Sequence, residues 1–343
     1  MKRLTSQKES MLWALSVLLM IAGAALLWLA LWPNRPAVAR LPVGMATQPL
    51  AEPAATAAPP PVRLVAPSPL PTSLEQGLAG WLAEQPGGQW VTDTLAADLW
   101  LTTEPNGEAL IERFYVPVAR FATLSPDISP PELLAMWLGG PGPGQLPLAV
   151  DSETAAALRL LWGEPAQVEV LPDAAAVAAA LELNPGRLGI LPFDQLLPQV
   201  QALSIDGNDP TDNQFLPNEY PLVLRFYLGY APEAAEMAES LRVYLADSGL
   251  RSNRDPSKLT VLAMTGVTAM ARVTALRMEQ QGYDYPAQAV GPQLAAADLT
   301  HISNEIPFVA DCQVDASENN LTLCSKPEYL AALRGVGVDL VGL

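Results

Sequence analysis

The chain has 343 residues, half of them hydrophobic, and a formal net charge of −17. Its pI near 4.4 and the lack of a basic stripe with interleaved aromatic residues exclude nucleic acid as an expected partner, because chain and phosphate backbone would repel each other. One histidine and two cysteines are too few for the usual nucleophile–base or two-metal arrangements.

The N-terminus has the pattern of a membrane anchor. Residues 11–32 are uncharged and rich in Leu, Ala and Trp, long enough to cross a hydrocarbon core of about 30 Å. Basic residues outnumber acidic ones in residues 1–10, which favours a cytoplasmic N-terminus. We therefore predict a single-pass protein of the cell membrane that contacts lipid through residues 11–32 and has its C-terminal part outside the cytoplasm. The alternative is a cleaved signal peptide, since Ala37-Val38-Ala39 fits a small-x-small cleavage site.

Residues 33–72 are rich in proline, alanine and threonine. Such a segment has little apolar surface to bury and few backbone donors to pair, so we expect a disordered spacer between membrane and folded part.

Residues 73–250 contain alternating strand and helix patterns and are expected to form one α/β domain. The expected strands are 97–103, 111–123, 148–150, 168–171, 187–191 and 220–227, and the expected helices are 131–138, 152–162, 173–183 and 232–248. Ser152 and Asp173 are candidate N-caps, and Gly249 a candidate C-cap.

The order of these elements resembles the periplasmic-binding-protein fold of the phosphate-binding type. The stretches that carry the resemblance are Val116-Pro117-Val118, residues 128–137 with Gly139, and residues 186–194. Because no Gly/Ser/Thr loop that would cradle phosphate is evident, no ligand residues are carried over. Arg113, Arg120 and Trp137 could line a cleft, but as lone residues they are interpreted as surface or packing positions.

Residues 251–257 are expected to be a linker, and residues 258–343 a second unit of alternating strands and helices. The expected strands are 258–265, 298–303 and 336–343, separated by a turn at Gly266 and by helices 268–281, 292–297 and 326–334. This order predicts a parallel sheet with right-handed crossovers.

Residues 265–272, 297–308 and 337–343 resemble the front half of the CapA family of capsule and poly-gamma-glutamate synthesis proteins. The resemblance implies a calcineurin-like metallophosphoesterase fold. The whole chain is thus expected to be α/β, with an N-terminal transmembrane helix, a periplasmic-binding-protein-like α/β domain and a truncated calcineurin-like β/α metallophosphoesterase domain.

The same resemblance names the candidate site residues. Glu305 matches the family's second motif and is the candidate catalytic residue, and Asn304 with Glu305 would be metal ligands. Val267 and Ser303 stand at two positions where the family has an aspartate and an asparagine, and the third motif would follow Leu343. A divalent metal is therefore expected only in a complete protein, and this chain is interpreted as catalytically incomplete, either a fragment or a pseudoenzyme.

Cys312 and Cys324 are the two cysteines. Outside the cytoplasm an even pair without a nearby histidine favours a disulfide over a zinc site.

Two functions are open. The first is a membrane-anchored CapA-like protein of capsule or poly-gamma-glutamate biosynthesis, acting on a cell-envelope polymer. The second is a non-catalytic extracytoplasmic module that binds a small anionic solute and carries a degenerate CapA-like scaffold.

Overall fold

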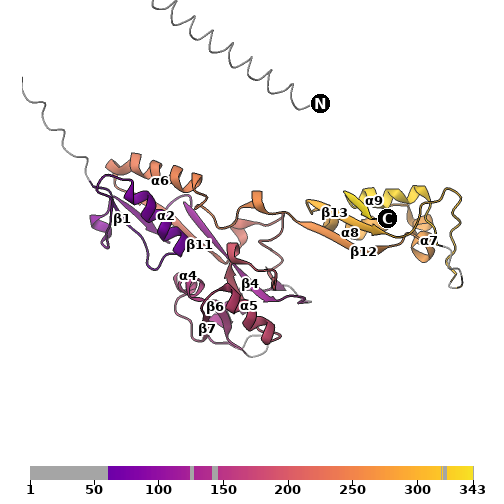
Figure 1. Cartoon of the computed structure of the whole chain (residues 1–343), viewed down its shortest axis with the longest axis horizontal. Coiled ribbons are helices and arrows are strands. Elements are labelled where there is room, and N and C mark those ends of the chain that lie inside the picture. The colour runs from indigo at the N-terminus through magenta and orange to yellow at the C-terminus, as the bar shows by residue number, and fades with distance from the viewer. Residues whose placement is uncertain (1–60, 124–126, 141–145, 318, 320–322, 343) are drawn as a thin grey trace, which may run out of the picture. The chain divides into compact units, whose positions relative to one another are not determined.

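A mixed β-sheet of nine strands organises the first folded region of the chain (Figure 1). The structure is a computed structural model that describes residues 61–342 apart from 124–126, 141–145, 318 and 320–322. The strand order is β2-β1-β3-β11-β4-β8-β6-β7, with β9 also paired to β4. The strands are β1 Arg63–Val65, β2 Gln89–Trp90, β3 Leu99–Thr102, β4 Ile111–Arg120, β6 Leu148–Asp151, β7 Val168–Leu171, β8 Gly189–Pro192, β9 Val200–Ala202 and β11 Val223–Tyr230.

Two groups of elements share this sheet. We call β1, β2, β3 and β11 with helices α2 (Thr72–Ala83) and α6 (Ala235–Asp247) the first lobe. The second lobe is β6, β7 and β8 with α4 (Ser152–Trp162) and α5 (Ala174–Leu183). Helix α3 (Pro130–Trp137) and a small pair of strands, β5 (Asp127–Ile128) and β10 (Ser204–Ile205), complete the region.

Strand β4 belongs to both lobes. Its residues 111–114 pair antiparallel with β11, and its residues 115–118 pair with β8. The chain thus enters the second lobe along β4 and returns along β11, and the two crossing strands lie side by side (Figure 1).

Alternation of apolar residues explains how both faces of the second lobe are buried. In β6, Leu148 and Val150 join the main core, whereas Ala149 faces the smaller core under α5. In β8, Ile190 and Leu191 divide in the same way. Successive side chains of a strand point to opposite faces, so continuous apolar runs fit strands covered on both sides.

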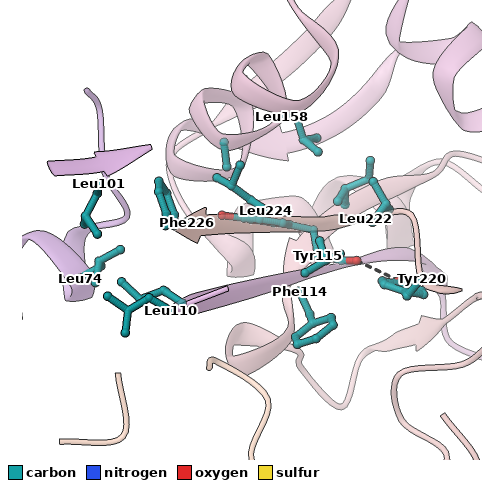
Figure 2. Packing of buried hydrophobic residues seen from close by; sticks show 14 of the residues in the cluster. Leu74, Leu101, Leu110, Phe114, Tyr115, Leu158, Tyr220, Leu222, Leu224 and Phe226 are labelled. Atoms are coloured by element: carbon teal, nitrogen blue, oxygen red, sulfur yellow. Dashed lines mark hydrogen bonds between the residues drawn. The ribbon is translucent and has the colours of Figure 1, made fainter. Parts of the chain in front are cut away.

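The main core continues along the crossing strands (Figure 2). The rings of Phe114, Phe215 and Tyr220 pack edge to face or tilted, with centroids 5.1–6.3 Å apart. The buried Tyr220 hydroxyl donates to the carbonyl of Tyr115 at 2.8 Å, so its polar atom is satisfied.

Most predicted elements of this region are confirmed, with ends shifted by a few residues. Residues 152–162 and 168–171 coincide with α4 and β7. The N-cap of α4 is Asp151 and not Ser152, because the Asp151 carboxylate accepts the N–H of Thr154 at 2.8 Å. Asp173 is confirmed as the cap of α5.

The spacer prediction was wrong at its C-terminal end. Residues 63–65 form β1, which pairs with β2 and β3 inside the sheet, and α2 begins at Thr72. Leu64 is fully buried, so tertiary packing outweighs the local proline content. The predicted membrane span, residues 11–32, lies outside the described residues. Within the described part of the chain, the helices fall short of the length and apolar character that a bilayer crossing requires.

A separate parallel sheet forms the C-terminal unit. Its order is β12-β13-β14, and its strands run parallel, as the sequence predicts. The elements are β12 Leu262–Thr268, α7 Arg272–Gln281, α8 Tyr285–Ala295, β13 Leu299–Asn304, α9 Leu330–Gly335 and β14 Leu340–Gly342. Met270, Met278, Ile302 and Tyr329 lie in its own core.

Two local predictions in this unit were wrong. Gly266 does not end the first strand, because β12 continues through it with a register shift between Met264 and Val267, where glycine suits an irregular strand. Helix α8 begins at Tyr285, because Pro286 occupies its first turn, where proline fits. Pro292, the expected start of the helix, lies inside it. The limits of the expected domains stay a prediction.

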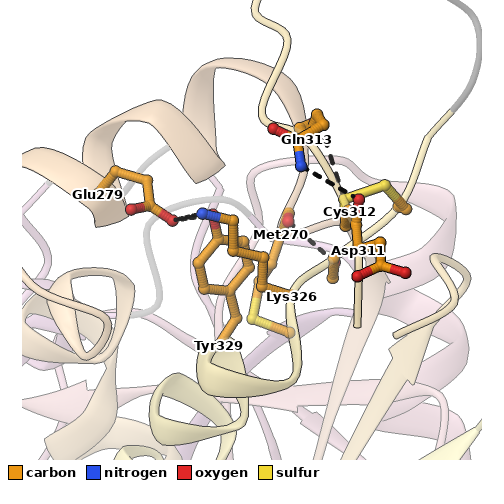
Figure 3. Close-up of a disulfide and its surroundings, with 9 residues drawn as sticks. Met270, Glu279, Asp311, Cys312, Gln313, Lys326 and Tyr329 are labelled. Atoms are coloured by element: carbon orange, nitrogen blue, oxygen red, sulfur yellow. Dashed lines mark hydrogen bonds and ion pairs between the residues drawn. A yellow bond between two sulfur atoms is a disulfide. The ribbon is translucent and has the colours of Figure 1, made fainter. Parts of the chain in front are cut away.

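The predicted disulfide is confirmed (Figure 3). Cys312 and Cys324 are bonded, with their Cα atoms 5.8 Å apart. Nearby, Glu279 accepts hydrogen bonds from Lys326 and from the Tyr329 hydroxyl, each at 2.7 Å. These contacts tie the start of α9 to α7.

Candidate functional site

A buried arginine lies where β4 passes from one lobe to the other. Arg113 is only 4% exposed. Its Nε and Nη2 atoms are fully buried and have no hydrogen-bond partner, and it forms no ion pair within the described part of the chain. A buried guanidinium normally has several partners, because its five donors and its charge are costly to remove from water.

Electrostatics around Arg113 only partly compensate its charge. Burial lowers the pKa of Arg113, and attraction by Asp194 and Glu153 offsets a part of that effect. The positive charge is therefore under-compensated in this structure. An anion that reached the guanidinium would gain a charge-assisted hydrogen bond without having to displace an existing ion pair.

Arg113 lines a cavity of about 620 Å³, a size typical of small-molecule sites. The first lobe contributes Ser73, from the first turn of α2, and the second contributes Phe193 and Asp194, which follow β8. The site therefore draws residues from both lobes and from the strand that joins them.

The segment after α6 forms another wall of this cavity. The carbonyl of Arg251 accepts the N–H of Glu112 at 2.8 Å. The Asn253 amide accepts from the N–H of Phe114 at 2.7 Å and donates to its carbonyl at 3.0 Å, and it also donates to Asp194 at 3.2 Å. Residues 251–253 thus satisfy the backbone of β4 just before it reaches β8.

Arg254 shows what a satisfied arginine looks like in the same cavity. It donates to the carbonyls of Pro210 at 2.7 Å and Asp212 at 3.1 Å, and its guanidinium lies 4.6 Å from the ring centroid of Phe215. Its charge has a structural role. Arg113, by contrast, has none of these contacts.

The structure excludes the surface position that the sequence allowed for Arg113, because its side chain is buried. Strand alternation cannot show that one position of β4 lies at a crossing between lobes, so no signal in the local sequence distinguishes it. The packing role is confirmed for Trp137, which is fully buried and donates from its ring nitrogen to the carbonyl of Gly163 at 2.9 Å. Arg120 ends β4 and is half-buried.

The CapA-like candidate residues lie together at the end of β13. Asn304 is buried and donates to the carbonyl of Ile306 at 2.8 Å, while its Oδ1 atom has no partner. Glu305 is exposed. Val267 is exposed and pairs in register with Ser303. In the described part of the chain, no three His, Cys, Asp or Glu side chains are grouped so that they could hold a metal ion.

The chain matches no known protein family. It matches no curated protein either. Solved structures to which it is similar include an ABC-type phosphate transport receptor from Vibrio cholerae (TM-score 0.43, 13% identity, covering 55% of this chain and 96% of that one). PstS from Borrelia burgdorferi has a TM-score of 0.40 and 10% identity, covering 55% of this chain and 93% of its own. A possible phosphate binding protein from Planctomyces limnophilus has a TM-score of 0.43 and 12% identity, covering 55% of this chain and 88% of its own. At these identities and TM-scores, the similarity assigns no ligand to this chain.

Proposed function

We propose that the two-lobed region is an extracytoplasmic solute-binding module for a small anion. The observation that carries this proposal is the buried, unpaired guanidinium of Arg113 in a cavity that both lobes line. The disulfide supports the location, because such bonds persist outside the cytoplasm.

The path of the chain supports the same proposal. The two lobes are joined by the adjacent strands β4 and β11, and the candidate site lies beside one of these crossings. Closure of two lobes around a ligand about a few connecting residues is a common mode of solute capture. A small oxyanion bound here would supply the missing negative charge beside Arg113. It would also accept hydrogen bonds from donors of both lobes.

Titration of the full-length protein with phosphate and with sulfate tests the proposal. We expect at least one of these ions to raise the unfolding temperature with a saturable dependence on concentration. Arg113→Gln should weaken binding at least about 30-fold, because truncating one partner of a buried charged contact costs 2–5 kcal/mol. A calorimetric titration measures both affinities.

Arg225→Gln is the matched control. Arg225 lies on β11 beside β4, donates to Glu112 at 2.8 Å and is not among the residues that line this cavity. Its loss should leave anion affinity within about twofold, because its guanidinium is paired with Glu112 and lies outside the cavity. Equal weakening by both substitutions would contradict a specific role for Arg113.

The CapA-like function of residues 258–343 is a separate proposal. It is supported by the parallel order of β12, β13 and β14 and by the position of Glu305 directly after β13. The described residues do not fit a two-metal site, because no three of their His, Cys, Asp or Glu side chains are grouped so that they could hold a metal ion. We therefore propose no hydrolytic step for this chain.

Metal analysis tests that conclusion. After incubation with Mn²⁺ or Zn²⁺ and dialysis, we expect no stoichiometric metal in the protein of residues 1–343 and no change in Glu305→Ala. Stoichiometric metal that Glu305→Ala removes would contradict this expectation and would restore the enzyme hypothesis.

A further inference from the structure

One hydrogen bond joins the two lobes next to the candidate site. The Glu153 carboxylate, in the first turn of α4, accepts the backbone N–H of Thr72 at 3.2 Å. Thr72 is the first residue of α2 and lies 81 positions away in the sequence. An acidic side chain of the second lobe therefore reaches the N-terminus of a helix in the first lobe.

The N-terminus of α2 is a place where an anion is favoured. Its N-cap residue is Pro71, which makes no side-chain capping bond. The first N–H groups of a helix lack partners within the helix and carry a partial positive charge, so they attract anions. Ser73, the next residue along α2, lines the same cavity as Arg113. Arg113 and the first turn of α2 therefore line one space.

Glu153 is not needed to cap its own helix. Asp151 already accepts the N–H of Thr154 at 2.8 Å and its hydroxyl at 2.9 Å. Yet Glu153 also attracts the Arg113 guanidinium electrostatically. Its carboxylate thus interacts with both groups that would receive an anionic solute, the N-terminus of α2 and Arg113.

We propose that Glu153 is an internal competitor for the anion site, which occupies the N-terminus of α2 when no solute is bound and must be displaced by the solute. The inference rests on the proposed function and adds a regulatory residue to it. A bound oxyanion close to an ionised Glu153 would be repelled, so the carboxylate has to leave the N-terminus of α2 before the solute takes its place. This competition lowers the affinity for the solute.

Substitution of Glu153 provides the test. We expect Glu153→Gln, which keeps the shape and removes the charge, to tighten binding of phosphate or sulfate by roughly 10- to 100-fold in calorimetric titrations of the full-length protein. Glu153→Ala should tighten it as well. Addition of Arg113→Gln to Glu153→Gln should abolish the gain, because both act on one anion.

Glu164→Gln is the matched control. Glu164 follows the same helix and pairs with Arg159 on the surface. The substitution removes the same charge from the protein as Glu153→Gln does, and it should leave the anion affinity unchanged. An equal gain in Glu164→Gln would attribute the effect to net charge and overturn the inference. Unchanged or weaker binding in Glu153→Gln, with binding intact in the wild type, would overturn the competitor role alone. No binding of either ion by the wild type and by Glu153→Gln would overturn the proposed function as well.

Discussion

Replacing Arg113 with methionine should raise the free energy of unfolding of the anion-free protein by about 1 to 3 kcal/mol. The Nε and Nη2 atoms of Arg113 are buried without hydrogen bonds, and burial lowers its pKa more than attraction by Asp194 and Glu153 raises it. Methionine has a similar length, is apolar and adapts to irregular space. Stability should therefore increase while anion binding is lost, as is common where a binding site is held in a costly arrangement.

Denaturant titration in a buffer without oxyanions measures this effect. Tryptophan fluorescence reports on the right part of the protein, because Trp81 and Trp137 are buried in the two-lobed region and residues 258–343 contain no tryptophan. The shift of the midpoint at constant slope gives the change in free energy.

Arg225→Met is the control with the opposite expected sign. Arg225 has partners, since it donates to Glu112 at 2.8 Å and to the carbonyl of Pro217 at 2.9 Å. Its replacement should lower the free energy of unfolding by roughly 0.5–1 kcal/mol, the usual range for a partly exposed ion pair. A loss of stability in Arg113→Met as large as in Arg225→Met would mean that Arg113 has a structural role, and it would contradict its assignment to an anion site.

Replacing both cysteines with alanine should lower the free energy of unfolding of the C-terminal unit by roughly 3 kcal/mol. The two residues are 12 positions apart, and the bond restricts the unfolded chain by closing the loop between them. The effect is large for this unit, because its core contains few residues and its sheet has only three strands.

Hydrogen exchange of peptides from β12, β13 and β14 measures the opening free energy of this unit separately from the two-lobed region. A Cys312→Ser/Cys324→Ser variant is the companion, because Cys312 is buried and a serine hydroxyl there adds its own cost. The alanine variant should therefore lose less free energy of unfolding than the serine variant. Unchanged exchange in both variants would contradict a stabilising role of the disulfide.

Local patterns in the sequence determined many of the elements. Helix α4 and strand β7 lie where apolar periodicity places them, because helical and extended backbones repeat their side-chain directions every 3.6 and every two residues. The sequence also predicted Asp173 as a helix cap, because its capping hydrogen bond joins residues only three positions apart. The cysteine pair was readable from its even number and expected compartment.

The sequence misled where local and tertiary preferences differ. Strand β1 lies in a proline-rich stretch and was assigned to the spacer, although the sheet buries Leu64 completely. Neighbouring strands β2 and β3 supply the backbone partners that stabilise it, and both come later in the chain.

The candidate site was decided by the tertiary structure. Nothing near Arg113 in the sequence shows that it lies at a crossing between two lobes, or that its guanidinium lacks a partner. The bond between Glu153 and Thr72 joins residues 81 positions apart. Patterns in the sequence report interactions within about one helical turn or one strand, whereas burial and charge compensation depend on which distant segments the fold brings together.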